Sequence, residues 1–462
     1  MKKEKMTMKK AIALLLSLLM VASLLAGCGG SAAPEAPATD APAAEAPAEA
    51  PAETNDKPYA GVVLNVLDVS YAPTNGLKEY LPEFEEMTGI KVNLEINAYA
   101  DVNTKKEVEL SAGSDAYDVM HVCSSTVNRL GNAGWIEDLT PYIEASPDYQ
   151  YEDIIAFARD TLTVGGTPYG VPVSCETLLL YYREDILAEL NLEVPTNPEE
   201  LLAACEVIAE KRPDLSAIAM RGRQGQGVNM FVVPTFMYAL GGAYWNEDRT
   251  EMLLNSEDTV AGIEFYANLM QNYAPAGAAD FDYTASYTSF AQGESVFLID
   301  SSGLVGILND PTISAVTDVW DCAAVFPDSE PCVPAFAHGL CINANSQNKG
   351  AAWEYIQWYT GIVMEERLGA EVKHCGTARV SSRESAAYLE ALGDNNFVQA
   401  FADAVPGARS DHRLLELTEW AYIGDTIGEA VQNIVLGADA QTTLDALQEN
   451  MTAFFTQEGY LK

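Results

Sequence analysis

From Tyr59 onward, the sequence alternates between short apolar segments and longer amphipathic ones. Residues 61–69 read GVVLNVLDV and predict a strand, residues 77–89 show helical spacing that ends at a glycine, and residues 90–96 alternate as a second strand. A chain that repeats strand, helix and strand in this order builds a mostly parallel sheet covered by helices. We therefore expect an α/β fold that binds its ligand at the carboxyl ends of the strands.

A second block with the same alternation follows Pro172. Its expected elements are strands at 295–300 and 339–344 and helices at 350–361, 426–437 and 440–457. A chain of 462 residues, 48% of them hydrophobic, can form two lobes of ordinary size.

The charge balance excludes several classes of partner. The chain has 67 Asp and Glu against 26 Lys and Arg, a net charge of −41. Such a chain cannot neutralise a row of nucleic-acid phosphates or bind anionic lipid electrostatically. With four histidines in the whole chain, a histidine-rich site is not expected, and we expect neither a metal nor a cofactor.

The N-terminus predicts export. Five lysines in residues 1–10 precede an apolar run at 11–25, which is shorter than the about 20 residues of a membrane span. The following Ser23-Leu24-Leu25-Ala26-Gly27-Cys28 resembles the bacterial lipobox. The resemblance implies that residues 1–27 are a lipoprotein signal peptide and that Cys28 carries the lipid.

Residues 28–58 are rich in Ala, Pro and Glu and contain no large apolar residue. A segment of this composition cannot bury a core, so we expect a disordered tether that reaches at most on the order of 90 Å. The expected location is the outer face of the cytoplasmic membrane, at the surface of a Gram-positive-type envelope.

The remaining cysteines do not form a metal or redox motif, because no C-x-x-C pair occurs among them. Most lie in apolar strings and are expected to be buried as small hydrophobic residues. The sequence leaves open whether Cys322 and Cys332 form a disulfide. The seven are Cys123, Cys175, Cys205, Cys322, Cys332, Cys341 and Cys375.

Six segments carry a resemblance to a known family. They are residues 81–95, 166–187, 240–248, 290–303, 338–360 and 435–451, in the family's order. With them the chain resembles the extracellular solute-binding proteins of ABC importers, family 1, which include maltodextrin- and polyol-binding proteins. The resemblance implies a two-lobed periplasmic-binding-protein fold, type II-like, with the ligand cleft between the lobes.

The resemblance also implies a division of the chain. The three crossings between lobes are expected near 170–174, 333–339 and 376–381, where Gly and Pro suit hinges. Lobe one would comprise 59–171 and 339–378, and lobe two 172–338 and 379–462.

Candidate ligand-binding residues are those that can bind hydroxyl groups or stack on a sugar ring. Glu176 matches the position at which maltodextrin binders place a ligand-bonding Glu, although it could also be a surface Glu at a helix start. Asp68 and Tyr71 end the first strand, and Ser124 and Ser125 follow the strand DVMHVC at 118–123; turn or helix caps are the alternative there.

The remaining candidates lie in the second block and at the crossings. They are Gln226 and Asn229 in the Gly-rich RGRQGQGVN, Trp245, Asp300 and Ser301 after strand SVFLID, His338, Arg379, Trp420 and Tyr422. For the aromatic residues, core packing is the alternative. Gly303 stands where many relatives carry an aromatic residue, which argues against a large stacked oligosaccharide.

These features predict a monomeric, non-enzymatic substrate-binding lipoprotein of an ABC importer. It would capture a sugar, small oligosaccharide or polyol by lobe closure and deliver it to a membrane permease that works with a cytoplasmic ATPase. The same fold binding a polyamine or another small polar metabolite is the alternative. A secreted hydrolase is the remote alternative, because G-x-S-x-G and H-E-x-x-H are absent from the sequence.

Overall fold

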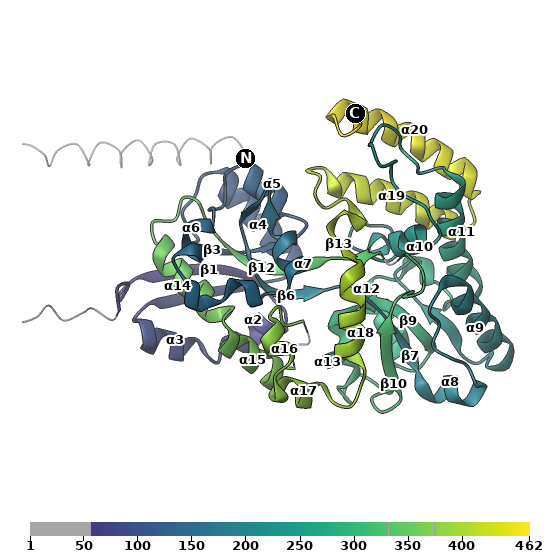
Figure 1. Ribbon diagram of the computed structural model, residues 1–462, viewed down its shortest axis with the longest axis horizontal. Helices are drawn as coiled ribbons and strands as arrows, with labels where there is room; N and C mark the ends of the chain where they lie inside the picture. Colours follow the sequence, from purple (N-terminus) through teal and green to yellow (C-terminus); the bar gives the residue numbers. More distant parts are fainter. Residues whose placement is uncertain (1–56, 331, 374–375) are drawn as a thin grey trace, which may run out of the picture. The chain divides into compact units, whose positions relative to one another are not determined.

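The computed structural model describes residues 57–330, 332–373 and 376–462, which belong to one compact unit, Asp56–Lys462. The expected signal peptide, Cys28 and nearly all of the tether lie outside the described residues. Within the described part, every helix is too short or too polar to cross a membrane. The unit contains two main sheets, each with its own helices (Figure 1). The expected α/β class with two lobes is confirmed.

The first lobe is built on a five-stranded sheet in the order β2-β1-β3-β12-β6. Its strands are β1 (Val63–Val69), β2 (Lys91–Asn97), β3 (Val119–Cys123), β6 (Val171–Glu176) and β12 (Phe336–Ile342). β1 pairs in parallel with β2 and β3, whereas β12 runs antiparallel to both β3 and β6. Between the first strands, α3 (Leu81–Thr88) stops at Gly89, whose φ of 75° suits the left-handed conformation that ends many helices.

The second lobe is built on a four-stranded sheet in the order β10-β7-β9-β8. Its strands are β7 (Leu178–Arg183), β8 (Ser216–Ala219), β9 (Ser295–Ser301) and β10 (Trp320–Ala324). Only β8 and β9 are parallel; β7 runs antiparallel to β9 and β10. The expectation of mostly parallel pairing is therefore wrong for this sheet, because β7 arrives directly from the first sheet without a crossover helix.

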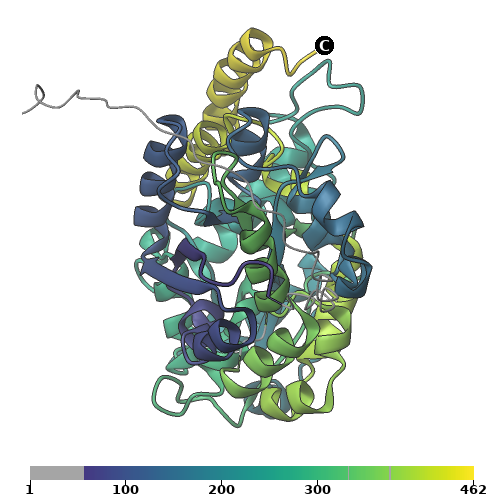
Figure 2. The ribbon, with the colours of Figure 1, turned by 90° about the vertical axis from the view of Figure 1, so that its left-hand side faces the viewer.

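Helices cover both sheets. In the side view of Figure 2, the blue and purple segments of the first lobe lie in front of the teal segments of the second. The other helices are α2 (Ala72–Leu77), α4 (Tyr99–Ser111), α5 (Val127–Asn132), α6 (Thr140–Glu144), α7 (Ala156–Thr161), α8 (Glu184–Leu190), α9 (Pro198–Lys211), α10 (Val233–Ala239), α11 (Glu257–Asn272), α12 (Tyr283–Ala291), α13 (Val305–Leu308), α14 (Lys349–Tyr359), α15 (Ile362–Glu371), α16 (Val380–Arg383), α17 (Ala386–Leu392), α18 (Phe397–Ala404), α19 (Trp420–Val435) and α20 (Ala440–Glu458). Short strands β4 (Thr163–Val164) and β5 (Thr167–Pro168) form a hairpin, and β11 (Val333–Pro334) pairs with β13 (Ala408–Arg409).

Two crossings between the sheets are very short. Thr177 alone separates β6 from β7, and Ala335 alone separates β11 from β12. At the third crossing, α17 contacts α15 of the first lobe, and α18 contacts β10 of the second. Residues 172–176, 336–338 and 379–392, which the expected division assigned to lobe two, thus pair or pack with the first lobe. The difference arises because β6 and β12 continue through the junction instead of ending before it.

All six cysteines that the structure describes are buried, and Cys123, Cys175, Cys205, Cys332 and Cys341 are free thiols. Cys322 and Cys332 do not pair, so the disulfide left open by the sequence does not form. Burial raises the pKa of Cys332 and of Cys341 to about 12, which keeps both thiols protonated and unreactive.

We expect Gly339→Ala to destabilise the junction. A Cβ at Gly339 in β12 would lie 2.3 Å from the carbonyl oxygen of Val171 in β6, so the two strands would have to separate. Overpacking of this kind costs about 1–3 kcal/mol. Urea denaturation measures the loss, with Gly227→Ala as the control, because no atom lies within 4 Å of a Cβ there. Equal stability of the two variants would contradict the prediction.

Candidate functional site

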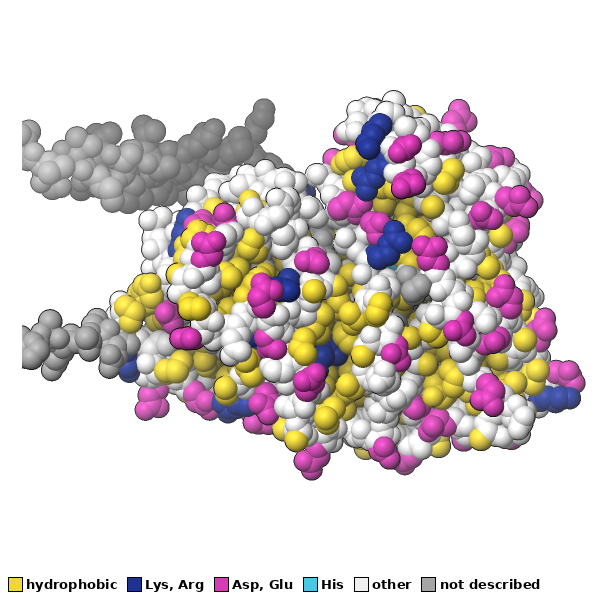
Figure 3. All heavy atoms as spheres, in the orientation of Figure 1, with side chains coloured by type: hydrophobic (Ala, Val, Ile, Leu, Met, Phe, Trp, Pro, Cys, Tyr) yellow, Lys and Arg dark blue, Asp and Glu magenta, His cyan; other side chains and the backbone are white. Residues whose placement is uncertain are grey.

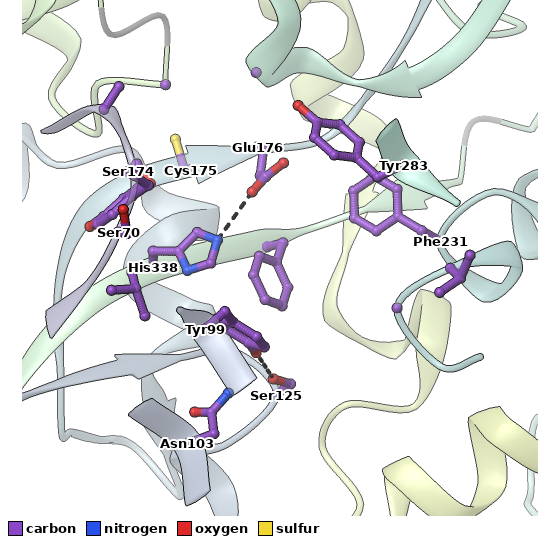
Figure 4. A pocket seen from close by; sticks show the side chains of 18 of the residues that line it. Ser70, Tyr99, Asn103, Ser125, Ser174, Cys175, Glu176, Phe231, Tyr283 and His338 are labelled. Atoms are coloured by element: carbon purple, nitrogen blue, oxygen red, sulfur yellow. Dashed lines mark hydrogen bonds and ion pairs between the residues drawn. The ribbon is translucent and has the colours of Figure 1, made fainter. Parts of the chain in front are cut away.

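A cavity of about 1470 Å³ opens between the two sheets and is lined by residues of both lobes. Figure 4 shows Glu176 and His338 near its centre, with Tyr99, Asn103 and Ser125 on the first-lobe side and Phe231 and Tyr283 on the second-lobe side. The site therefore lies where the strands of the first sheet end and pass into the second lobe, as expected for an α/β fold.

An ion pair occupies the centre of the cavity wall. Glu176 is the last residue of β6, and His338 lies beside it on β12; His338 Nε2 is 3.3 Å from Glu176 Oε1. Burial opposes ionisation of Glu176, but the hydrogen bond and charge of His338, with the hydroxyl of Ser301, lower the Glu176 pKa to about 2. Burial also opposes the charge of His338, yet Glu176 raises the His338 pKa above its usual value. Each of the two groups therefore favours the charged form of the other.

The second histidine of the site stays neutral. His338 Nδ1 lies 3.0 Å from His121 Nε2. Burial, followed by the charges of Lys106 and His338, holds the pKa of His121 well below its usual value. When His338 is protonated, both of its ring nitrogens donate, so His121 Nε2 accepts and the proton of His121 is carried on Nδ1.

On the second lobe, Arg221 is fixed by Asp300. The guanidinium of Arg221 donates from Nε and Nη2 to Asp300 Oδ1, at 3.0 and 2.5 Å, and stacks near Phe231 and Tyr283. Asp300 is fully buried and also accepts from Ser286. Asp300 thus positions Arg221, and Arg221 presents the charge to the cavity.

Arg413 lies nearby without such a partner. Its guanidinium sits 4.8 Å from the Phe231 ring centre and 5.0 Å from that of Phe336. Burial and then the charge of Arg221 lower the Arg413 pKa to about 10. Arg413 follows β13, where the last crossing segment returns toward the junction.

Six of the predicted residues line the cavity: Tyr71, Ser125, Glu176, Gln226, His338 and Trp420. Eight others do not: Asp68, Ser124, Asn229, Trp245, Asp300, Ser301, Arg379 and Tyr422. Four of these eight support the cavity wall from behind. Ser301 donates to Glu176, and Asp300 pairs with Arg221. Asp68 and Asn229 hold neighbouring loops.

Hydrogen bonds show how Asp68 and Asn229 hold these loops. Asp68 accepts from Val69 N and from the Thr74 hydroxyl, each at 2.7 Å, and burial raises its pKa to about 7. Asn229 accepts from Gly225 N and donates to Gly428 O at 2.8 Å, which ties the Gly-rich loop to α19.

Ser124 and Arg379 are structural. The Ser124 hydroxyl accepts from Ala337 N at 2.8 Å and joins β3 to β12. Arg379 is fully buried in the first lobe and donates to the carbonyls of Thr360, Gln150 and Tyr149 at 2.6 to 3.1 Å. A guanidinium saturated in this way is not available to a ligand in the cavity.

The two aromatic residues outside the cavity are explained by their helices. Trp420 lines the cavity, whereas Tyr422 is 47% exposed and its ring contacts that of Phe454. The two differ because residues two apart on a helix do not share a face. Trp245 packs against Phe455 and Arg249 at the far side of the second lobe.

Several lining residues were not predicted from the sequence: Tyr99, Asn103, Ser174, Arg221, Phe231, Tyr283, Phe336 and Arg413. Tyr99 and Asn103 lie in the first turns of α4, the helix after β2. The rule that ligands bind at the carboxyl ends of strands would have pointed to them, had it been applied to this strand. Arg221 opens the RGRQGQGVN segment that suggested Gln226 and Asn229. Arg413 belongs to no motif, and only the fold brings it to the cavity.

Comparisons with known proteins agree on one family. The model of a family described as "Bacterial extracellular solute-binding protein" matches residues 70–362. The mannitol-binding protein of Pseudomonas aeruginosa is 24% identical over 77% of this chain and 84% of its own length. The erythritol/L-threitol-binding protein of Mycolicibacterium smegmatis is also 24% identical, over 85% of this chain and 86% of its own.

Solved structures show the same fold. An ABC transporter solute-binding protein from Agrobacterium radiobacter K84, in complex with ribitol, superposes with a TM-score of 0.76 at 22% identity and covers 86% of this chain and 100% of its own. One from Agrobacterium vitis S4, with bound D-mannitol, superposes with a TM-score of 0.73 at 20% identity and covers 86% and 99%.

We expect Arg379→Lys to destabilise the protein. Lysine cannot donate to three carbonyls arranged around a planar guanidinium, and each lost hydrogen bond to a charged group costs about 1.5–3 kcal/mol. Urea denaturation measures the change, with Arg212→Lys as the control, since Arg212 forms surface ion pairs with Asp214 and Glu189. An Arg379 variant as stable as the control would show that the carbonyl contacts are not needed.

The charge of His338 predicts a pH dependence. Because the folded pKa is raised, the stability that this pair contributes is complete below the unfolded pKa, about 6.5, and is lost as pH rises through the folded pKa. The stability difference between the wild type and His338→Gln should be larger at about pH 5.5 than at about pH 9.

His412→Gln provides the opposite case. Burial holds the pKa of His412 well below its usual value, so the folded state binds its proton less tightly and loses stability as pH falls. The difference between the wild type and this variant should therefore be smaller at the lower pH. Urea midpoints at both pH values test both signs, and differences that do not vary with pH would contradict them.

Proposed function

Because this chain belongs to the bacterial extracellular solute-binding proteins, we propose that it captures a polyol or small sugar outside the cytoplasm for an ABC importer. The family consists of binding proteins and not of enzymes. The described relatives that bind mannitol, erythritol and L-threitol, and the neighbours solved with ribitol and D-mannitol, support a small hydroxylated solute.

The observation that carries this proposal is the composition of the cavity wall. Charged and polar groups converge on it from both lobes: Glu176 and His338 from the first, Arg221 and Gln226 from the second. Such groups bind vicinal hydroxyls in pairs. The rings of Trp420 and Phe231 supply the flat apolar faces that pack on the carbon chain or ring of a sugar.

The loop after β9 favours a small solute. Gly303 lines the cavity, and a Cβ there would lie 3.3 Å from Ser301 Oγ and 3.9 Å from Glu176 Oε2. The loop thus approaches the central Glu176 closely and offers no aromatic ring at this position. A long oligosaccharide would lack a stacking platform here, whereas a polyol or monosaccharide would not need one.

Capture would proceed by closure of the lobes. Solute that touches both lobes stabilises the closed form over the open one, and the short crossings provide the hinges. The closed form would then deliver the solute to a membrane permease driven by a cytoplasmic ATPase. We further propose that the protein acts as a monomer, anchored by lipid on Cys28 and held away from the membrane by residues 28–58.

A thermal-shift screen of residues 29–462 tests the proposal. Ligand that binds only the folded state adds about 2.7 kcal/mol of stability at a hundredfold excess over Kd. Ribitol, mannitol, erythritol, glucose and maltose are screened beside spermidine and amino acids. A higher melting temperature with polyols or small sugars is expected. A shift with spermidine or an amino acid alone would keep the fold and overturn the proposed solute.

We expect Trp420→Ala to weaken solute binding about tenfold, because it removes an aromatic face from the cavity. Tyr422→Ala is the matched control: it removes a similar ring from the same helix, but that ring packs on Phe454 outside the cavity. Isothermal titration with the best ligand of the screen measures both affinities. If the two variants bound equally well, the cavity would not be the binding site.

A further inference from the structure

Three basic side chains, His338, Arg221 and Arg413, line the cavity, and two of them have a carboxylate partner. His338 pairs with Glu176, and Arg221 pairs with Asp300. Arg413 forms no ion pair with any residue that the structure describes. An arginine without an ion pair is unexpected in a chain of net charge −41, whose Asp and Glu side chains are spread over both halves of the face in Figure 3.

The hydrogen-bonding capacity of Arg413 is largely unused. The side chain is 5% exposed, and Nε and Nη2 are buried without a partner among residues 57–330, 332–373 and 376–462. Nη1 contacts only the carbonyl of Gln226, at 3.4 Å, which is near the upper limit of a hydrogen bond. Buried guanidinium groups normally satisfy these donors, so the site is incomplete as it stands.

Other arginines of the chain show what completes such a group. In Arg183, Arg212 and Arg409, Nε and Nη2 together donate to the two oxygens of a nearby Asp. Arg221 uses the same two nitrogens to bind Asp300. A carboxylate is thus the partner that this chain repeatedly gives to that edge of the guanidinium.

The other carboxylates of the cavity do not serve Arg413. Asp425 accepts from the backbone N–H of Gln226, and Asp310 accepts from the backbone and hydroxyl of Thr312. Glu107 pairs with Arg129. The charge of Arg413 is therefore left for something that enters the cavity.

We propose that the solute carries a carboxylate as well as hydroxyl groups, as in a sugar acid, and that Arg413 recognises this carboxylate. The inference rests on the proposed function, because it names the class of solute within the same site. A carboxylate would replace the long contact to Gln226 and neutralise the buried cation. Attraction between the charges is strong there, because burial and the surrounding Phe231 and Phe336 exclude water. The positive charge of Arg413 also disfavours a polyamine at this place in the cavity.

Pairs of solutes that differ in one group test the proposal. Isothermal titration of residues 29–462 compares ribitol with ribonate, mannitol with mannonate, and glucose with glucuronate. We expect the acid of at least one pair to bind at least tenfold more tightly than its neutral partner. If the neutral partners bind equally well or better, the carboxylate inference is wrong and the proposed function stands. If no member of any pair binds, the proposed function fails, and this inference fails with it.

Two variants assign the preference to Arg413. Arg413→Met keeps an extended apolar side chain between the two phenylalanines and should remove the preference for the acid, so that an acid and its neutral partner bind with similar affinity. Arg409→Met is the control: it removes one positive charge from the same segment, but Arg409 pairs with Asp411 outside the cavity. The control should retain the full preference. A preference that survives in Arg413→Met would overturn the role of Arg413.

Stability without solute provides an independent measurement. Removing an unpaired buried cation should raise the melting temperature of Arg413→Met above that of the wild type, whereas removing a paired cation in Arg409→Met should not. A clear fall in the melting temperature of Arg413→Met would show that its charge is already compensated. If that variant does not fold, Arg413→Lys, which keeps the charge and loses the paired donors, should show a reduced preference for the acid.

Discussion

The pairing of β6 with β12 fixes the position of everything else in the cleft. Both strands belong to the first sheet, and both lead into the second lobe within one residue of the pairing. Their register places His338 opposite Ser174 and Phe336 opposite Glu176. The central ion pair therefore lies at the junction of the lobes, and the backbone hydrogen bonds of the sheet hold its two members. Ser302 strengthens this junction, because its hydroxyl accepts from Thr177 N at 3.1 Å and its N–H donates to Thr177 O at 2.8 Å.

The cavity shows how buried charge is distributed between support and recognition. Asp300 and Glu176 form ion pairs with Arg221 and His338, and each also accepts a hydrogen bond from the hydroxyl of a serine. Such satisfied pairs give a rigid wall at little net electrostatic cost. Arg413 has two aromatic rings around it, and no carboxylate of the described residues lies within ion-pair distance of its guanidinium. In this proposal the preference for a carboxylate comes from Arg413, the guanidinium without such a partner. The total number of charged groups in the wall does not decide it.

The sequence was sufficient to predict the class of fold, five strands of the two main sheets to within two or three residues, and the place of Glu176 and His338 in the cavity wall. These features depend on local periodicity and on a motif. It was not sufficient for Arg379, whose position near a crossing suggested the cleft, although its side chain turns inward to three carbonyls of the first lobe. Trp420 and Tyr422 were equivalent in sequence and differ only by the face of α19 on which they lie. Arg413 was missed because residues distant in sequence, Phe231 and Phe336, create its environment.

The single residue between β6 and β7 has a consequence for the path of lobe motion. Thr177 contributes only two rotatable backbone bonds, those of φ and ψ. If the lobes move as proposed, the second lobe therefore cannot slide away from the first at this point. It would rotate about an axis that passes close to Thr177. Ala335, the only residue between β11 and β12, gives a second pivot beside it. In the proposed closure, Glu176 and His338 would stay nearly in place because they lie next to these pivots, whereas Trp420, at the start of α19, would move with the second lobe. In this closure a solute would first bind to Glu176 and His338, whose positions hardly change. Trp420 would contact the solute only when the second lobe closes.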